Sequence, residues 1–264
     1  MTAAALYGNF FYSIYDYREY LKESVFRDLR KKYKRSSLGY LWSMLNPLLM
    51  MIILTVVFSS LMKGRVENYS VFLFSALLPW TYFNGTVKSC IGTIRQNAKI
   101  LDQLPIPKYI FSVSSSFYNF VDLFLAFVPL LLVMLFTGHP IHSTIIIFPL
   151  MLIPLFFFSM GLGLLLAVSN VFFEDTAHLT DVLLRAMYFL CPILYNRDML
   201  PPWLVKYVVL NPMFGIIEGI RQLLYFGTLP NLETFLFNLA GSVLVLGLGL
   251  YAFNKADDKF VYFI

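Results

Sequence analysis

Long uncharged segments alternate with short charged ones along most of this chain. The clearest uncharged segment runs from Leu41 to Met62 and contains no charged residue. A helix rises about 1.5 Å per residue, so roughly 20 apolar residues cross the hydrocarbon core of a bilayer. This pattern predicts an all-α integral membrane protein with six transmembrane helices. The predicted spans cover residues 41–62, 69–87, 111–137, 143–173, 180–195 and 235–253.

The segment of residues 200–229 does not follow this pattern. It contains Pro201, Pro202 and Pro212, and it also carries Glu218 and Arg221 among apolar neighbours. Irregular backbone at membrane depth is tolerated only where protein covers it or where it lines a cavity. We therefore expect short re-entrant or interfacial helices here, directly before the last span.

The residues before the first span predict a different kind of helix. An apolar residue recurs every four positions, and lysine, arginine and acidic residues fill most of the remaining positions. This periodicity is typical of an amphipathic helix lying in the membrane interface, although a solvated helix packed against a partner has the same pattern. The apolar stripe consists of Tyr17, Leu21, Val25, Leu29 and Tyr33. The predicted organisation is therefore a cytoplasmic region of residues 1–40 and a transmembrane domain of residues 41–264.

Charge supports this interpretation and orients it. Only 13% of the residues are charged, against about 25% in globular proteins. Basic residues concentrate beside the apolar spans, including a block directly before the first one, which favours contact with lipid headgroups over nucleic acid. With six spans and both termini in the cytoplasm, 15 of the 20 Lys and Arg residues lie on the cytoplasmic side. Seven spans with an external C-terminus are the competing topology.

Few residues indicate chemistry within the chain. The sequence has no GxxxxGK[ST] loop, no HExxH motif and no paired cysteines, so we expect neither ATP hydrolysis nor a metal site here. His139 and His142 fit an external turn, and Cys90 and Cys191 fit buried or free thiols. Asp122 lies within an apolar segment, which makes it a functional candidate. A position at headgroup depth or a bond to a neighbouring helix would explain it equally well.

The aromatic content is high, with 17 Tyr, 27 Phe and 3 Trp. Aromatic faces can contact sugar rings along a transport path, and aromatic side chains also serve as ordinary lipid-facing residues. Both explanations stay open at this point.

Five stretches together resemble one family, the type-2 ABC transporter permeases that export O-antigen, capsule or teichoic acid polysaccharides. The resemblance runs from about residue 15 to the C-terminus. The order and spacing of the stretches make it specific. The stretches are DLRKKYKRSSLGYLWSMLNPLL (28–49), LLPWTYF (77–83), NAKILDQLPIPKYI (97–110), CPILY (191–195) and NPMFGIIEGIRQLL (211–224). One departure is FFED at residues 172–175, where members often carry Arg-Asp after two aromatics, and this puts a cationic contact at that corner in doubt.

The resemblance implies roles for several residues. The motif at the start of the first span is formed by Leu38, Gly39, Trp42 and Pro47. A loop that docks on the ATPase is formed by Asn97, Lys99, Ile100, Leu101, Leu104, Pro105, Pro107 and Lys108. Candidates for the path and its gate are Tyr40, Trp80, Tyr82, Asp122, Pro192, Tyr195, Asn211, Pro212, Glu218 and Arg221.

The resemblance also implies an assembly in the bacterial inner membrane. Two copies of the permease would work with two copies of an ABC ATPase, which would bind ATP and magnesium, while this chain would need no cofactor. The partners would be membrane lipid and a lipid-linked glycan. Two alternatives remain, a type-2 ABC exporter of drugs or small lipids and a multispan enzyme acting on lipid-linked glycans.

Overall fold

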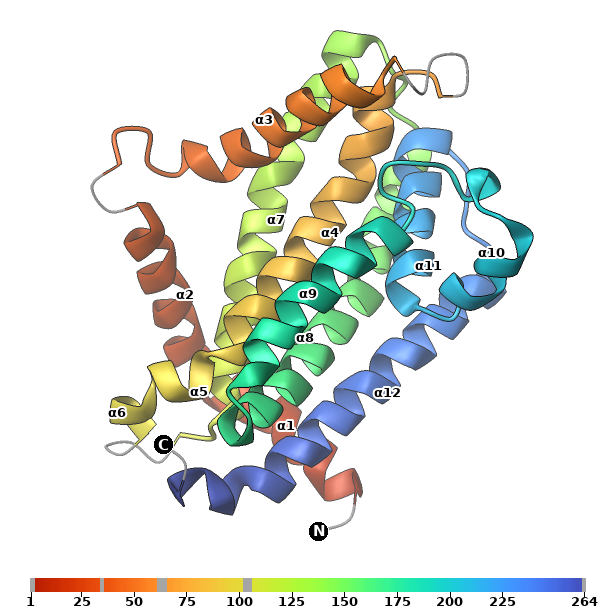
Figure 1. The fold of residues 1–264 in the computed structure, drawn as a ribbon. Helices are drawn as coiled ribbons and strands as arrows, with labels where there is room; N and C mark the ends of the chain where they lie inside the picture. Colours follow the sequence, from red (N-terminus) through yellow and green to blue (C-terminus); the bar gives the residue numbers. More distant parts are fainter. Residues whose placement is uncertain (1–2, 34–35, 61–65, 102–105, 263–264) are drawn as a thin grey trace.

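The computed structural model describes residues 3–33, 36–60, 66–101 and 106–262, and these contain helices and no strand (Figure 1). The longer helices are α1 (Ala3–Asp16), α2 (Arg18–Tyr33), α3 (Leu41–Phe58), α4 (Tyr69–Ile91), α7 (Tyr109–Thr137), α8 (Phe148–Phe172), α9 (Asp175–Leu190), α11 (Pro212–Arg221) and α12 (Leu232–Ala256). The shorter helices are α5 (Thr93–Gln96), α6 (Ala98–Leu101), η1 (Ser143–Ile147), η2 (Arg197–Met199), α10 (Pro202–Val208), the π-helix η3 (Gln222–Phe226) and η4 (Asp257–Tyr262).

Helix α4 forms the centre of the bundle. It packs against α7 and α8, and most of its side chains are buried. A helix that is apolar around its circumference is stable only when other elements surround it. The largest apolar cluster accordingly gathers around α4, with Phe72, Phe74 and Phe83 completely buried.

Helices α8 and α12 make the closest approach between long helices. A Cβ atom on Gly161 would lie 2.5 Å from the Cα of Leu246, and one on Gly249 would lie 2.6 Å from the carbonyl oxygen of Gly161. Small residues allow this approach, which is a common way for helices to associate in membranes. The two glycines therefore set the distance between α8 and α12.

Four helical segments of the described residues are long and apolar enough to cross a membrane, and the α10–α11 pair would make a fifth. The four are Leu41–Phe58, Tyr109–Thr137, Ser143–Phe172 and Leu232–Ala256, and each overlaps a predicted span. The predicted second span corresponds to α4, and the predicted re-entrant region to α10 and α11–η3, which are bent by 103° at a short break. The count of six spans therefore stays a prediction.

The predicted fifth span, residues 180–195, has different bounds in the structure. Helix α9 already begins at Asp175, five residues before the predicted start, and an acidic residue in a first helical turn is favourable. Helix α9 ends at Leu190, because Pro192 has no N–H to continue the hydrogen-bonding ladder. The predicted first span also ends earlier, at Phe58, while residues 61–65 lie outside the described part of the chain.

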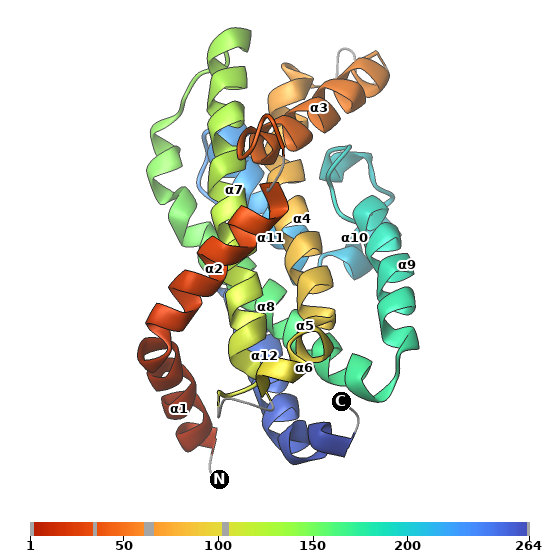
Figure 2. The same cartoon turned by 90° about the vertical axis from the view of Figure 1, so that its left-hand side faces the viewer.

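The apolar stripe of α2 faces protein. Leu21 and Leu29 are each only 6% exposed, and α2 packs diagonally along α7 (Figure 2). Tyr17 and Val25 are half-buried, and the side chain of Tyr33 lies outside the described residues. The amphipathic helix is therefore present, and its described stripe packs against α7. The interfacial position of the helix stays a prediction.

Helix α3 lies obliquely across α4 and α7 instead of running alongside them (Figure 1). Only 11% of the residues of α3 are buried. The opposite end of the bundle carries α1, the short helices α5 and α6, and η4, so the described ends of the chain lie on the same side (Figure 1).

Replacing Gly161 with Ala should disturb the α8–α12 contact, because the added methyl group meets backbone atoms that cannot rotate away. We expect the free energy of unfolding to fall by about 1–3 kcal/mol. Thermal unfolding of the purified protein in detergent measures this. Gly241→Ala on α12 is the matched control, since its nearest neighbour would be a Pro212 side-chain atom at 3.3 Å. Equal losses in both variants would contradict the assigned contact.

Candidate functional site

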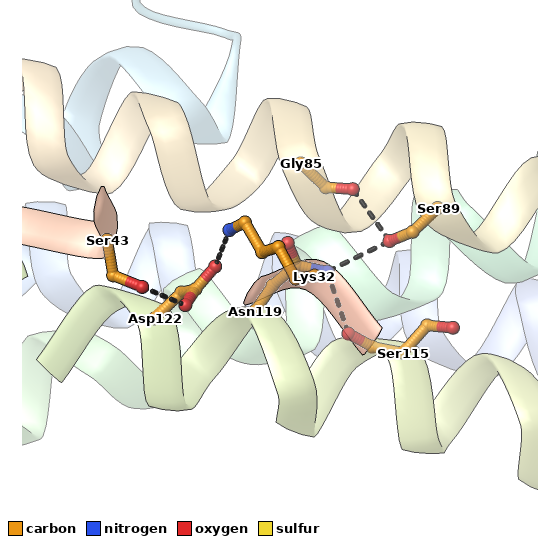
Figure 3. Close-up of polar contacts among 7 residues, drawn as sticks. All are labelled: Lys32, Ser43, Gly85, Ser89, Ser115, Asn119 and Asp122. Carbon is orange, nitrogen blue, oxygen red and sulfur yellow. Dashed lines mark hydrogen bonds and ion pairs between the residues drawn. The ribbon is translucent and has the colours of Figure 1, made fainter. Parts of the chain in front are cut away.

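A polar cluster connects the corner between α2 and α3 to the middle of α7. The carboxylate of Asp122, on α7, accepts a charge-assisted hydrogen bond from Lys32 Nζ on the last turn of α2 (Figure 3). It also accepts one from Ser43 Oγ, in the first turn of α3, at 3.0 Å. Asp122 therefore holds both sides of this corner. Its side chain is only 18% exposed, which weakens competition from water.

A second group of polar contacts lies one turn away along α7. Asn119 Nδ2 donates to Ser89 Oγ at 2.9 Å and to the carbonyl oxygen of Ser115 at 2.7 Å (Figure 3). Ser89 Oγ donates in turn to the carbonyl oxygen of Gly85 at 2.7 Å. A Cβ atom on Gly85 would lie 2.7 Å from Asn119 Oδ1, so a larger residue here would displace the Asn119 amide.

These two groups border a pocket of about 250 Å³ between α2, α3, α4 and α7. Its lining includes the Lys32–Asp122 pair, the rings of Trp42 and Tyr82, and the amides of Asn46 and Asn84. The lining thus combines two aromatic rings, an ion pair and several hydrogen-bonding groups in one concave site, as ligand pockets commonly do.

A buried arginine organises the region around α11 and the start of α4. Arg221 on α11 is 2% exposed and lies 3.7 Å above the ring of Phe72. Its guanidinium donates to the carbonyl oxygens of Ile193 at 3.1 Å and Tyr195 at 3.4 Å. The fork of donors on arginine suits two adjacent acceptors, so Arg221 holds the turn after α9 against α11.

Further contacts support the same turn. Tyr69 on α4 donates its hydroxyl to the carbonyl oxygen of Leu194 at 3.0 Å. Asn211 caps α11 by accepting from the N–H of Met213 at 3.1 Å, and its amide nitrogen lies 3.7 Å from Cys191 Sγ. Glu218 pairs with Arg197 at 3.5 Å. The structure therefore brings the predicted gate residues Pro192, Tyr195, Asn211, Pro212, Glu218 and Arg221 into one region.

The two histidines of the outer turn act as packing residues. His139 stacks on Tyr225 with ring centroids 5.0 Å apart, and its Nε2 lies 3.1 Å from the Tyr225 carbonyl oxygen. Burial lowers the pKa of His139, which favours the neutral form of its ring. Among the described residues no group of three or more His, Cys, Asp or Glu could hold a metal ion.

The predicted docking loop contains α6, and α5 directly precedes it. Asn97, with its amide donating to the Thr93 carbonyl oxygen at 2.7 Å, lies between these two helices. Ile100, Pro107 and Lys108 are half-buried. Lys99 and Leu101 belong to α6, but their side chains lie outside the described part of the chain, as do Leu104 and Pro105 altogether.

Ion pairs hold both ends of this loop. Arg95 pairs with Glu174 at the α8–α9 corner and also donates to the Val171 carbonyl oxygen at 3.4 Å. At the other end, Lys108 Nζ bonds Asp257 through its carboxylate at 2.9 Å and its carbonyl oxygen at 2.8 Å. The acidic FFED corner therefore does receive a cation, supplied by Arg95.

The remaining predicted residues lie elsewhere. Trp80 and Tyr82 are 6% and 3% exposed, and their rings contact Tyr188 and Phe120 within one copy of the chain. In the motif at the start of the first span, Gly39 has φ +50°, a conformation that favours glycine, and Leu38 and Tyr40 are exposed. Trp42 and Pro47 line the pocket described above.

Several residues that make these contacts were not predicted from the sequence. Lys32 was recognised only as part of a basic block, and Ser43, Phe72 and Tyr69 had no distinguishing signal. Arg95 and Glu174 could have been paired by their opposite charges at neighbouring cytoplasmic loops, but the many charges there offer several pairings. Only the tertiary structure shows which of these charge pairs forms.

Replacing Asp122 with Ala should release the α2–α3 corner, because Lys32 and Ser43 lose their shared acceptor. We expect the free energy of unfolding to fall by about 1.5–3 kcal/mol, as for hydrogen bonds to charged groups. A double-mutant cycle with Lys32→Ala, followed by thermal unfolding, measures the coupling. Glu23→Ala, on the exposed face of α2, is the control. Fully additive effects of the two substitutions would contradict a direct contact.

Replacing Arg221 with Met should destabilise the outer region, because the carbonyl oxygens of Ile193 and Tyr195 lose their donor. We expect a loss of at least about 1.5–3 kcal/mol, and a smaller one for Arg221→Lys, which retains the charge but not the planar fork. Thermal unfolding measures this loss of stability, and the rate of proteolysis in the segment after residue 190 shows where the structure loosens. Arg197→Met is the control, since Arg197 is 45% exposed. A neutral Arg221→Met variant would exclude this role.

Comparisons with known proteins agree with this architecture. The family described as ABC-2 type transporter matches residues 20–225. The O-antigen export system permease protein RfbA of Klebsiella pneumoniae is 31% identical over 239 residues, covering 89% of this chain and 90% of that protein. RfbA of Myxococcus xanthus is 28% identical, covering 94% and 96%. The polysialic acid transport protein KpsM of Escherichia coli is 24% identical, covering 89% and 93%. With most of its length matched by this family, the chain belongs to the ABC-2 type transporters.

Proposed function

We propose that this chain is the transmembrane permease subunit of an ATP-driven exporter that moves a lipid-linked polysaccharide across the bacterial inner membrane. The observation that carries the proposal is near-complete coverage by relatives whose names specify O-antigen export. The sequence has no GxxxxGK[ST] loop, so hydrolysis of ATP, with its magnesium ion, belongs to a separate ATPase subunit. This chain supplies the route and needs no cofactor of its own.

The proposed topology has six spans and cytoplasmic termini. The spans are α3, α4, α7, η1 with α8, α9, and α12, and α10–α11 form a re-entrant segment on the outer side. An even number of crossings agrees with α1 and η4 lying at the same end of the bundle (Figure 1). Helix α9 has only 16 residues, and the buried turn from Cys191 to Leu194 would complete its crossing.

The proposed assembly contains two permeases and two ATPases. Helices α3 and α9 both expose large apolar side chains, including Ile53 and Val56 on α3 and Val182 and Phe189 on α9. These faces need lipid or a second copy to cover them. In the proposed dimer the first and fifth spans of the two copies line the path.

The proposed mechanism transmits closure of the ATPases through the loop of residues 97–108. The ion pairs Arg95–Glu174 and Lys108–Asp257 connect the flanks of this loop to the α8–α9 corner and to η4. Movement of α5 and α6 would then carry several spans as rigid bodies. The Arg221 region would close the outer mouth, and α2 would lie where a lipid-linked substrate approaches from the cytoplasmic side.

Co-purification tests the proposal directly. The chain is expressed with the ABC ATPase encoded beside it, reconstituted in lipid nanodiscs, and assayed for ATP hydrolysis with and without candidate lipid-linked glycans. We expect a stable complex and stimulation by the glycan. Stimulation by hydrophobic drugs alone would favour a drug exporter, and turnover of a lipid-linked glycan by the isolated chain would favour an enzyme. Reporters that place the termini on opposite sides would overturn the topology.

Replacing Lys99 with Glu and Leu101 with Ala should uncouple hydrolysis from export. A coupling free energy of 1–3 kcal/mol between sites predicts an export rate lower by about 5- to 150-fold while the bundle stays folded. Export into vesicles and phosphate release are measured on the same sample. Lys206→Glu with Leu236→Ala, outside the docking loop, is the matched control. Unchanged export would exclude this loop as the docking element.

A further inference from the structure

Two amides line the pocket beside Asp122 without a protein partner. Neither Asn46 on α3 nor Asn84 on α4 makes a hydrogen bond with any residue that the structure describes. The indole N–H of Trp42, in the same lining, likewise has no partner among the described residues. All three belong to predicted spans, and the Asn46 side chain is exposed while Asn84 and Trp42 are half-buried, so they remain accessible to a bound molecule. Such groups in one concave site indicate a polar ligand.

The charges of the pocket favour an uncharged ligand. Lys32 and Asp122 are the charged residues of its lining, and they neutralise each other through their ion pair. An anion would meet the Asp122 carboxylate, and a cation would meet the Lys32 ammonium. A neutral group that donates and accepts hydrogen bonds can lie beside the Asp122 carboxylate and the Lys32 ammonium alike.

The lining also restricts the chemistry of the ligand. Each free amide offers donors and an acceptor, which matches the dual character of a hydroxyl group. The rings of Trp42 and Tyr82 add apolar faces for C–H groups. A sugar ring combines hydroxyl groups at its edge with C–H groups on its faces. The volume of about 250 Å³ is smaller than the roughly 300–1,000 Å³ of sites for drug-sized ligands, so it suits one ring.

We propose that the pocket between α2, α3, α4 and α7 is a binding subsite for one sugar ring of the glycan. This inference rests on the proposed function and adds a recognition site within each copy, separate from the path between copies. Asn46 and Asn84 bind the hydroxyl groups, and Trp42 contacts a face of the ring. The Lys32–Asp122 pair places α2 at the rim of the pocket, so occupancy and the position of α2 are linked.

The binding test uses the permease–ATPase complex in nanodiscs and two amphiphiles with the same tail. The probe is dodecyl β-D-glucoside, and the control is dodecyl tetraethylene glycol ether, which lacks the sugar ring. Trp42 fluorescence is isolated by Trp80→Phe and Trp203→Phe. We expect a saturable change with the glucoside alone. A net contribution of about 1 kcal/mol per hydrogen bond predicts an apparent Kd about 5-fold weaker for Asn84→Leu and about 20- to 30-fold weaker when Asn46→Leu is added.

Asn254→Leu, an exposed amide on α12, is the matched control and should leave the apparent Kd unchanged. A second measurement avoids the tryptophan substitutions. A thiol introduced by Thr81→Cys in the pocket lining is labelled with a maleimide, which the buried Cys90 and Cys191 resist. The glucoside should slow labelling several-fold, and the polyether should not.

Equal responses to the two amphiphiles, or an unchanged Kd in the double leucine variant, would overturn the subsite. ATP hydrolysis and complex formation are measured on the same samples. A complex that hydrolyses ATP under glycan control without glucoside binding at this pocket would reject only the subsite. Failure to assemble with the ATPase would reject the proposed function.

Discussion

The carboxylate of Asp122 is the contact on which the N-terminal part of the molecule depends. It lies near the middle of α7 and accepts hydrogen bonds from Lys32 at the end of α2 and Ser43 at the start of α3. A carboxylate within an apolar span is unfavourable unless it is paired, and these two partners satisfy it. The same contacts hold the last turn of α2 and the first turn of α3 against α7.

Arg221 solves a similar problem in the region around α11. Its guanidinium is buried against Phe72 and satisfies two carbonyl oxygens of the irregular turn after α9. Backbone that leaves a helix inside a membrane protein requires such replacement donors. Both regions thus rely on one charged side chain that compensates for broken helical regularity.

The end of the bundle that carries α5, α6 and η4 is held differently (Figure 1). Arg95–Glu174 and Lys108–Asp257 are partly exposed pairs, and pairs of this kind contribute little to stability. Their value lies in connecting a short loop to two separate parts of the bundle. In the proposed mechanism, weak contacts are suited to a region that moves when a partner closes, whereas the buried contacts of Asp122 and Arg221 are suited to regions that move as units.

The local pattern of the sequence determined which segments are helical, where prolines interrupt them and which family the chain resembles. Hydrophobic periodicity predicted α7, α8 and α12 closely, and the breakers before the last span predicted α10 and α11. The ends of α9, the facing of the α2 stripe and the direction of α3 depended on contacts with other helices. Lys32 and Asp122 are 90 residues apart, and Arg221 lies 28 residues from Ile193. Burial of apolar surface is non-directional and can be inferred from a local pattern, whereas a hydrogen bond requires two particular groups to meet, which only the tertiary structure decides.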